Sequence, residues 1–209
     1  IKSKSTESNF IDFLKKRLPV ERIRQVSDEY MLGATKSRDV IFWQIDFTGK
    51  VRTGKIMKYD PLIGKRIHNQ NGAIDWVHNK LKHQGKISQN FNLAQCLFGE
   101  HLLKHYPEKV VAIVESEKTA ILASVLYPEH IWLSTGTLNG LTLDKCFVLE
   151  NRTVIIFPDL GKAHAIWKEK ADEISKFIHW KVSVSELLPK IASQDADNEG
   201  LDLADFLLN

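Results

Sequence analysis

The sequence predicts an α/β protein in which a smaller α+β domain with an antiparallel hairpin precedes a parallel sheet flanked by helices. Two observations lead to this fold class. After residue 108, short apolar runs alternate with helical segments, which is the pattern of βαβ units. Before that point, two segments rich in β-branched and aromatic residues are separated by a Thr-Gly turn. We therefore expect two domains, one over 1–108 and one over 109–209.

The first domain is expected to begin with two helices, because its apolar residues recur at helical spacing and Pro19 stops the first run. The period then changes to that of two strands joined by a tight turn. The elements expected here, two helices, two strands and two further helices, cover 5–18, 20–30, 40–47, 50–59, 76–81 and 92–106.

The second domain is expected to hold a parallel sheet with right-handed crossovers. Its first strand is a five-residue apolar run, as expected for a strand buried on both faces. The expected strands cover 110–114, 131–133, 154–157 and 180–184, and the expected helices cover 117–127, 163–178 and 201–208.

The charges divide unevenly between these halves. Residues 1–108 hold 19 Lys and Arg against 11 Asp and Glu, whereas residues 109–209 hold 10 against 15, so that halves of +8 and −5 give the net charge of +3. A basic half joined to an acidic half suits a polyanion on one side and metal ions on the other. Chance placement of solvated surface charges explains such a division equally well.

Cysteine usage and hydropathy exclude several protein classes. Cys96 and Cys146 are far apart and lack a CxxC partner, which excludes a disulfide framework or a cysteine-rich zinc module within these residues. No apolar run approaches the roughly 18 residues that a membrane span needs. We therefore expect a cytoplasmic protein with no membrane partner.

Two acidic residues follow expected strands of the second domain. Glu115 comes directly after 110–114, and Asp159 follows 154–157 after a single proline. Neighbouring strands lie about 4.8 Å apart, so two such carboxylates can share one divalent ion, and Asp202 and Asp205 can add further oxygens. Hard oxygen ligands favour Mg²⁺ or Mn²⁺. For either acid alone, capping a helix N-terminus is the more common role.

The expected hairpin and the loop after it present a basic surface to nucleic acid. Its cationic residues are Lys50, Arg52, Lys55, Lys58, Lys65 and Arg66. The alternative is an ordinary solvated sheet face. Trp43 and Phe47 have two possible roles as well, since such aromatic residues stack on bases in single-strand binders but belong more often to the core.

Several segments resemble the Toprim domain of bacterial DNA primases and phage primase-helicases. Residues 114–120 (VESEKTA) resemble the Toprim glutamate motif, and residues 155–161 (IIFPDLG) resemble its Asp-x-Asp motif. The loop 134–136 resembles the small-residue turn between them, and 200–205 (GLDLAD) resembles the late acidic motif. More loosely, residues 40–66 resemble the basic hairpin region before Toprim. The whole is most similar to primase-like proteins of bacterial mobile elements.

The sequence departs from the Toprim pattern at two positions. Ser116 replaces the usual glycine after the glutamate, which is a small change. Gly161 stands where the second aspartate of Asp-x-Asp belongs, which weakens binding of a second metal ion. Either another acid compensates, or the protein binds nucleic acid with little catalysis. The acids that can compensate are Asp195, Asp197, Asp202 and Asp205.

The resemblance implies metal-dependent nucleotidyl transfer. Glu115 and Asp159 would be the catalytic residues that hold Mg²⁺ or Mn²⁺, with single-stranded DNA and nucleoside triphosphates as substrates and a helicase or another mobile-element replication protein as partner. Lys118 would contact a phosphate, or form an ion pair with Glu115 or Glu117. Two alternatives stay open, a non-catalytic nucleic-acid-binding protein with a degenerate Toprim domain and a Toprim nuclease.

A zinc site is a weaker alternative. His101 and His105 are four residues apart in the expected helix 92–106, with Glu100 beside them, and this spacing can hold zinc on one helix face. The HExxH order is absent, and no third ligand is evident. A GxxxxGK[ST] phosphate loop is also absent from the sequence, so no ATP-driven motor is implied.

Overall fold

The chain folds into two compact units, each with its own sheet. The computed structural model describes residues 7–68 and 74–208. The first unit spans Ile1–Cys96 and holds an antiparallel sheet, and the second spans Leu97–Asn209 and holds a parallel sheet. The mixed α/β fold class is therefore confirmed. None of the described helices is both long and apolar enough to cross a membrane.

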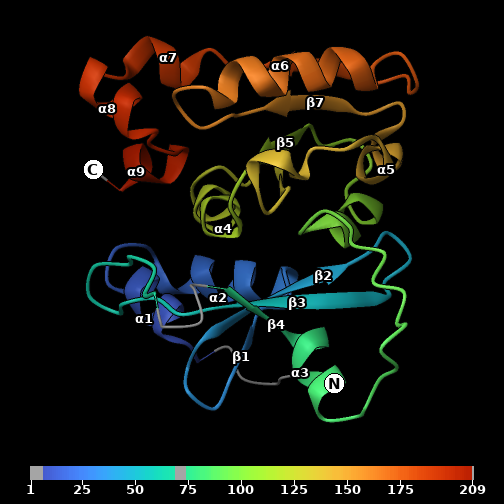
Figure 1. Ribbon diagram of the computed structural model, residues 1–209. Helices are drawn as coiled ribbons and strands as arrows, with labels where there is room; N and C mark the ends of the chain where they lie inside the picture. The colour runs from blue at the N-terminus through green and yellow to red at the C-terminus, as the bar shows by residue number, and fades with distance from the viewer. Residues whose placement is uncertain (1–6, 69–73, 209) are drawn as a thin grey trace. The chain divides into compact units, whose positions relative to one another are not determined.

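The first unit combines two N-terminal helices with a four-stranded antiparallel sheet (Figure 1). Its strands pair in chain order, β1-β2-β3-β4. The central pair keeps one register from Val40↔Met57 to Gln44↔Thr53 and is irregular only after Gln44, next to the turn. The elements of this unit are α1 (Asn9–Lys15), α2 (Val20–Glu29), β1 (Gly33–Ala34), β2 (Val40–Ile45), β3 (Val51–Met57), β4 (Ile74–Trp76) and α3 (Val77–His83).

Aromatic packing joins α1 to this sheet. The ring of Phe10 lies edge-on to Phe42 of β2, with centroids 5.6 Å apart, and 5.0 Å from the ring of Tyr59. All three rings are buried, and aromatic pairs at such distances add to the stability gained from burial alone. The apolar face of α1 therefore anchors the helix to the sheet.

The first helix is shorter than the sequence predicts. It begins at Asn9 because the hydroxyl of Ser8 accepts a hydrogen bond from the Ile11 amide at 3.3 Å and caps the helix. Of the expected range 5–18, residues 5 and 6 lie outside the described residues, and the helix ends at Lys15. The second helix and the two hairpin strands are confirmed.

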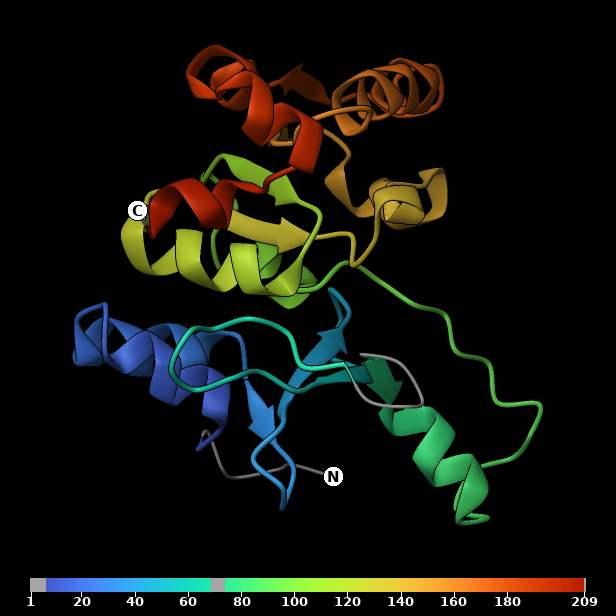
Figure 2. The same ribbon diagram turned by 60° about the vertical axis from the view of Figure 1, so that its left-hand side comes forward.

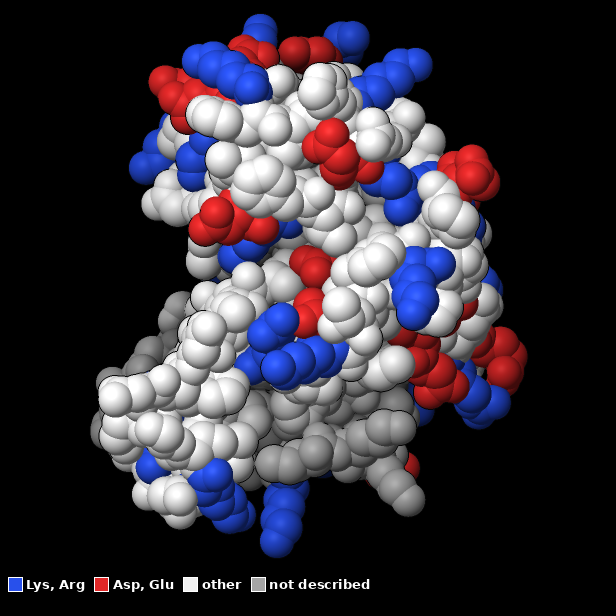
Figure 3. All heavy atoms as spheres, turned by 90° about the vertical axis from the view of Figure 1, so that its right-hand side faces the viewer, with Lys and Arg blue, Asp and Glu red and all other residues white. Residues whose placement is uncertain are grey.

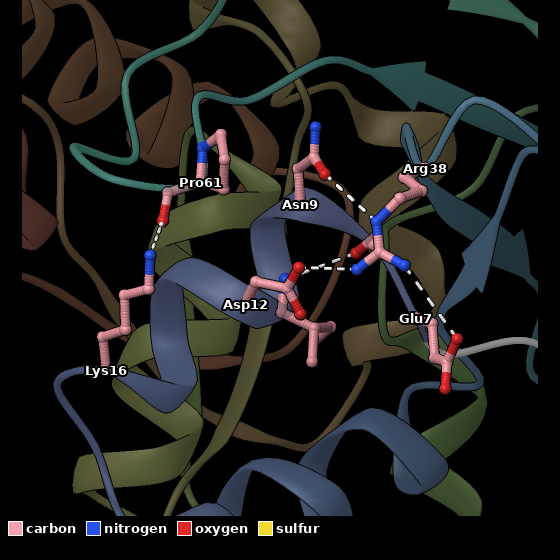
Figure 4. Close-up of polar contacts among 8 residues, drawn as sticks. Glu7, Asn9, Asp12, Lys16, Arg38 and Pro61 are labelled. Carbon is pink, nitrogen blue, oxygen red and sulfur yellow. Dashed lines mark hydrogen bonds and ion pairs between the residues drawn. The ribbon is translucent and has the colours of Figure 1, made fainter.

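Polar contacts fix α1 to two loops of the first unit (Figure 4). Arg38, in the loop before β2, donates to Asn9 Oδ1 and forms an ion pair with Asp12. The Asn9 amide in turn donates to the Arg38 carbonyl at 2.9 Å. Lys16 Nζ donates to the Pro61 carbonyl at 3.1 Å. The helix is thus attached both before β2 and after β3.

The second unit is built on a four-stranded parallel sheet of order β6-β5-β7-β8. All four predicted strands and both predicted crossover helices are present, with ends that differ by a few residues. Its elements are η1 (Glu100–Lys104), β5 (Val111–Val114), α4 (Glu117–Leu126), β6 (Ile131–Ser134), η2 (Leu138–Gly140), α5 (Leu143–Cys146), η3 (Phe147–Leu149), β7 (Thr153–Ile156), α6 (Ala163–Ile174), β8 (Lys181–Val184), α7 (Leu187–Ile191), α8 (Gln194–Glu199) and α9 (Leu203–Leu207).

The strand order of this sheet reverses between β5 and β7. From β5 the chain passes through α4 to β6 at one edge, and from β7 it passes through α6 to β8 at the other edge. Since parallel crossovers are right-handed, these two connections place α4 and α6 on opposite faces of the sheet (Figures 1 and 2). In open parallel sheets, ligands bind at such a reversal, beyond the carboxyl ends of the strands.

The predicted helix over 92–106 is wrong. Residues 92–97 have no regular structure, Phe98 forms an isolated bridge with Ser134, and only the 3₁₀ helix η1 follows. Gly99 adopts a left-handed conformation, with φ of 83°, which a continuous helix does not permit. The apolar residues here are buried without forming a helix, so their helical spacing is misleading.

Arg152 ties this segment to the second unit. Its guanidinium donates to the backbone carbonyls of Leu103, Tyr106 and Lys109, at 3.3, 2.9 and 2.9 Å. The sequence placed residues 97–108 in the first domain, whereas in the structure they pack with the parallel sheet. Two short helices, α7 and α8, also lie in the polar segment where the sequence indicated only a loop, and the last predicted helix is confirmed as α9.

Candidate functional site

The two predicted catalytic acids follow neighbouring strands. β5 and β7 pair in parallel with the register Val111↔Val154, and the pairing continues past β7 because the Phe157 amide donates to the Ile113 carbonyl at 2.8 Å. Glu115 directly follows β5, and Asp159 comes shortly after β7. Both acids therefore lie beyond the same edge of the sheet, at the reversal of strand order.

The late acids lie at the start of α9 and cap it. The Asp202 carboxylate accepts from the Asp205 amide at 3.1 Å, and the Asp205 carboxylate accepts from the Asp202 amide at 3.0 Å, which makes a reciprocal capping box. The capping role that the sequence left open for Glu115 belongs to Ser116, the N-cap of α4, and α6, which follows Asp159, has no side-chain cap.

Two hydrogen bonds attach the start of α9 to the rest of the site. The hydroxyl of Thr119, a buried residue in the first turn of α4, donates to Asp202 Oδ2 at 2.8 Å. The amide of Leu160, next to Asp159, donates to the Leu201 carbonyl at 3.1 Å. Because one bond comes from α4 and the other from the loop after β7, the late acids are held near both strand ends.

Asp159 has the most perturbed ionisation among these acids. Its pKa is raised to about 8, first by burial and then by the negative charges of Asp202, Glu115 and Asp205, while Lys118 acts to lower it. The pKa of Asp202 is also raised, first by burial and then by Asp205, against the effect of Lys118 and the hydrogen bond from Thr119. All four predicted acids therefore interact around Asp159.

The acidic residues fit a hard divalent cation in their chemistry. Like charges around a half-buried carboxyl are an arrangement that a cation stabilises, and carboxylate oxygens are the ligands that Mg²⁺ prefers. Within residues 7–68 and 74–208, however, no three side chains of His, Cys, Asp or Glu converge closely enough to hold an ion by themselves. Mg²⁺ commonly uses only one or two protein carboxylates and completes its shell with water and other oxygen ligands, so a pair of strand-end carboxylates is enough for such an ion.

Gly161 occupies the place of the second acid of the Asp-x-Asp pattern. Its backbone is left-handed, with φ of 73°, which favours glycine. Its amide donates to Asp197 Oδ1 at 2.9 Å, so a carboxylate from α8 lies next to the position where the sequence lacks one. Asp195 is exposed on the same helix. Of the acids considered as replacements, Asp197, Asp202 and Asp205 are therefore attached to the site.

Lys118 belongs to the acidic site. It lies in the first turn of α4, and its charge acts on Asp159 and Asp202. From the sequence, two roles were open for Lys118: contact with a phosphate, or an ion pair with Glu115 or Glu117. Because its charge acts on two other acids, Asp159 and Asp202, it lies close to the strand-end carboxylates.

Sequence reasoning missed the hydroxyl groups of this site. Ser116 caps α4 by accepting from the Thr119 amide, and the Ser116 and Thr119 hydroxyls lie 2.9 Å apart. Since Thr119 donates its hydrogen to Asp202, Ser116 is the donor to Thr119 in this chain of hydroxyls. The Ser-x-x-Thr spacing after a strand-end glutamate is the signal that indicates such a network.

The predicted basic surface of the first unit is only partly present. Lys50, Lys58, Lys65 and Arg66 are exposed. Lys55, by contrast, is only 3% exposed, contrary to its expected place on a solvent-facing surface. The alternation rule failed here because all residues from 53 to 57 of β3 are buried, whichever way their side chains alternate.

Arg52 is engaged within its own hairpin. Its Nε donates to Asp46 Oδ2 at 2.7 Å. Burial acts to raise the pKa of Asp46, but hydrogen bonds from Thr48, the Lys50 amide and Arg52 lower it below its usual value. Asp46 is therefore ionised, and it holds the turn of the hairpin. The sequence pattern predicts Arg52 as a free cation and does not predict its ion pair with Asp46.

The face seen in Figure 3 carries side chains of both charges. Lys and Arg side chains there are interspersed with Asp and Glu. Among the predicted cations of the first unit, the exposed side chains of Lys50, Lys58, Lys65 and Arg66 are the ones that can reach a nucleic acid.

Of the two possible base-stacking residues and the two possible zinc ligands, one member of each pair is buried and the other is exposed. Trp43 is 7% exposed and belongs to a core cluster with Ile41, Ile45 and Ile56, whereas Phe47 is exposed. His101 is buried within the 3₁₀ helix η1, whereas His105 follows the last residue of that helix and is exposed. The zinc alternative thus loses its geometric basis.

Both cysteines are free and buried. Burial raises the pKa of the Cys146 thiol to about 12, so it is an inert core residue.

The fold is similar to that of DNA primase catalytic cores. The solved structure of the DnaG catalytic core is 12% identical, with a TM-score of 0.57, and the match covers 99% of this chain and 77% of that one. The primase fragment of the bacteriophage T7 primase-helicase protein is 13% identical, with a TM-score of 0.50, over 88% of this chain and 68% of that one. At this level of identity the likeness concerns the fold alone.

Sequence comparison adds a family. No curated protein shows significant sequence similarity to this chain. One family model matches residues 8–160, a range that includes Glu115 and Asp159 and ends before the late acids. Since this match spans most of the sequence, the chain belongs to the family described as a domain of unknown function, DUF6371.

Proposed function

We propose that the second unit is a Toprim domain and that the protein is a primase-like nucleotidyltransferase, which uses Mg²⁺ or Mn²⁺ to make short primers on single-stranded DNA. The observation that carries this proposal is the position of Glu115 and Asp159 beyond neighbouring strands at the reversal of strand order. The interaction of Asp159 with Glu115, Asp202 and Asp205 supports it, as does the primase-like fold.

Each residue of the site has a defined part in this proposal. Glu115 and Asp159 bind the ion, and Asp202, held by Thr119, adds negative charge beside them. When bound, the ion would position the triphosphate and offset the charge that develops during transfer. Lys118 would bind a phosphate oxygen next to the carboxylates. The exposed cations Lys50, Lys58, Lys65 and Arg66 would hold the template through its phosphates.

A second candidate function is a non-catalytic nucleic-acid-binding protein on the same scaffold. Gly161 favours it, because the chain lacks the acid that the Asp-x-Asp pattern supplies there. The absence of a three-ligand cluster among the described side chains favours it as well.

A primer-synthesis assay tests the proposal. The protein would be incubated with single-stranded DNA, labelled ribonucleotides and Mg²⁺ or Mn²⁺, next to Glu115→Gln and a matched control, Glu169→Gln, whose side chain is exposed on α6. Because Glu115→Gln removes one charge without changing the shape, we expect labelled products from the wild type and from the control only.

Three other results of this assay would redirect the proposal. Equal products from Glu115→Gln would contradict the assigned site. DNA that is bound but neither extended nor cut would support the non-catalytic function. Metal-dependent nicking without added nucleotides would identify a nuclease.

The wider context also belongs to this proposal. The resemblance to primase-like proteins of mobile elements implies a role in replicating such an element in the cytoplasm, with a helicase or another replication protein as partner. Co-purification of the tagged chain with a helicase is the measurement that addresses the partner.

A further inference from the structure

A small cavity opens in the first unit, between the end of the hairpin and the segment around α3. Its volume is about 240 Å³. The hairpin contributes Trp43 and residues 51–53, α3 contributes Val77, His78 and Leu81, and the segment after α3 contributes Ile87 and Phe91. No residue of the acidic site lies in its wall, so it is a separate feature of the molecule.

Two aromatic side chains, Trp43 and Phe91, line this cavity. Trp43 packs across β3 at Gly54, where an added Cβ would lie 2.8 Å from the Trp43 ring, so the indole is held in place. Phe91 is 37% exposed and lines the cavity as well. Aromatic and aliphatic walls with few polar groups suit a planar apolar ring, and each nucleobase has such a face.

A cation with fixed orientation lies in the same wall. Asp46 accepts the Arg52 Nε hydrogen at 2.7 Å and is itself fixed by the Thr48 and Lys50 amides. In the described part of the chain, Arg52 makes no other hydrogen bond, and its side chain is 28% exposed. Its terminal nitrogens are therefore available to an anion, and guanidinium groups bind phosphate oxygens in pairs.

We propose that this cavity binds one base of a single-stranded nucleic acid, with the adjoining phosphate on Arg52. The base stacks on Phe91 and contacts the apolar wall to which Trp43 belongs. A planar ring joined to an anion matches both the apolar wall and the charge of its rim. The volume is below the roughly 300–1,000 Å³ that drug-sized ligands occupy, which suits a single ring system. This inference rests on the proposed function, since single-stranded nucleic acid is the template there.

An oligonucleotide that carries one 2-aminopurine and a terminal dye tests the inference on the full chain. Stacking quenches 2-aminopurine fluorescence, while dye anisotropy reports binding of any kind. We expect wild-type protein to change both signals. In Phe91→Ala the quenching disappears and affinity falls roughly 5- to 100-fold, because one stacked base is lost. The matched control is Phe147→Ala, which removes an exposed phenylalanine outside the cavity and leaves both signals unchanged.

A second variant keeps the inference testable if Phe91→Ala does not fold. Arg52→Gln keeps the cavity wall apolar but removes the cation, so quenching persists while binding loses part of its salt dependence. Anisotropy without quenching in the wild type would overturn the cavity assignment and leave the proposed function intact. Equal quenching by Phe91→Ala and wild type would overturn it too. No anisotropy change in the wild type would count against both.

Discussion

The two units of this protein organise their charged residues in different ways. In the second unit, strand topology brings Glu115 and Asp159 to one edge of a parallel sheet, and hydrogen bonds from Thr119 and Leu160 hold the segment with Asp202 and Asp205 beside them. In the first unit, cations are spread along a hairpin, and one of its lysines, Lys55, is buried. Acids that follow parallel strands can be predicted from the sequence once the strands are found. Whether the lysines of a hairpin are exposed depends on how its strands pack.

The largest expected effect concerns stability and pH at Asp159. Its pKa of about 8 exceeds the usual 3.8, so the folded chain keeps a proton that the unfolded chain loses above about pH 4. The free energy of unfolding should therefore fall as pH rises from about 4 to 8, by on the order of 5 kcal/mol at most. Above pH 8, the contribution of Asp159 becomes constant.

Urea unfolding between pH 4 and pH 9, with a chelator present, measures this effect. Asp159→Asn, which carries no ionisable group, should show a much flatter pH dependence and should be more stable than the wild type at pH 9. Superimposable pH curves for the two proteins would mean that Asp159 has an ordinary pKa.

The next effect tests where the second unit begins. Arg152→Ala removes three hydrogen bonds to carbonyls of the segment before β5 and should lower the free energy of unfolding by about 3 kcal/mol. Arg24→Ala, which loses only an exposed helix-surface pair, should change it by less than about 0.5 kcal/mol. Equal effects of the two substitutions in urea unfolding would show that Arg152 does not hold the segment before β5 to the second unit.

A smaller effect is expected at Thr119. Thr119→Val keeps the volume but removes the hydrogen bond to Asp202, so Mn²⁺ affinity should fall roughly 10-fold, as is typical for residues that orient a metal site. Thr119→Ser keeps the hydroxyl and should restore binding. Calorimetric titration distinguishes the two, and a serine variant as weak as the valine variant would show that the methyl group is what matters.

The smallest effect concerns two lysines of the hairpin: Lys58, which is exposed directly after β3, and Lys55, which is buried within β3. Lys58→Ala should reduce the salt dependence of single-strand binding by about 0.7 in log–log slope, because one phosphate contact is lost. Lys55→Met should leave this slope unchanged, since its side chain is buried. The measurement is binding anisotropy at several salt concentrations, and a reduced slope in Lys55→Met would restore Lys55 to the nucleic-acid surface.

Sequence patterns were sufficient for the parallel sheet and its acids, and insufficient elsewhere for identifiable reasons. Short apolar runs mark β5, which is buried on both faces, and β7, and an acid follows each of these strands. The segment over 92–106 shows helical spacing, yet Gly99 and the bridge from Phe98 to Ser134 give it another structure. Tertiary contacts override local periodicity there.

The polar contacts of the site were also beyond sequence reasoning. Thr119 and Asp202 are far apart in the chain and meet only because α4 and α9 pack together. The bond from the Gly161 amide to Asp197 depends in the same way on the fold of α8. Such contacts between distant segments need the three-dimensional structure, whereas the order of strands and acids does not.

The central claim is that Glu115 and Asp159 together bind one divalent ion. Calorimetric titration of Mn²⁺ into the wild type, Glu115→Gln and Asp159→Asn at pH 8.5, where Asp159 is largely ionised, tests it most directly. We predict one binding event in the wild type, which is weaker at pH 7 and absent in both variants. Binding of equal strength in either variant, or none in the wild type, would contradict the account.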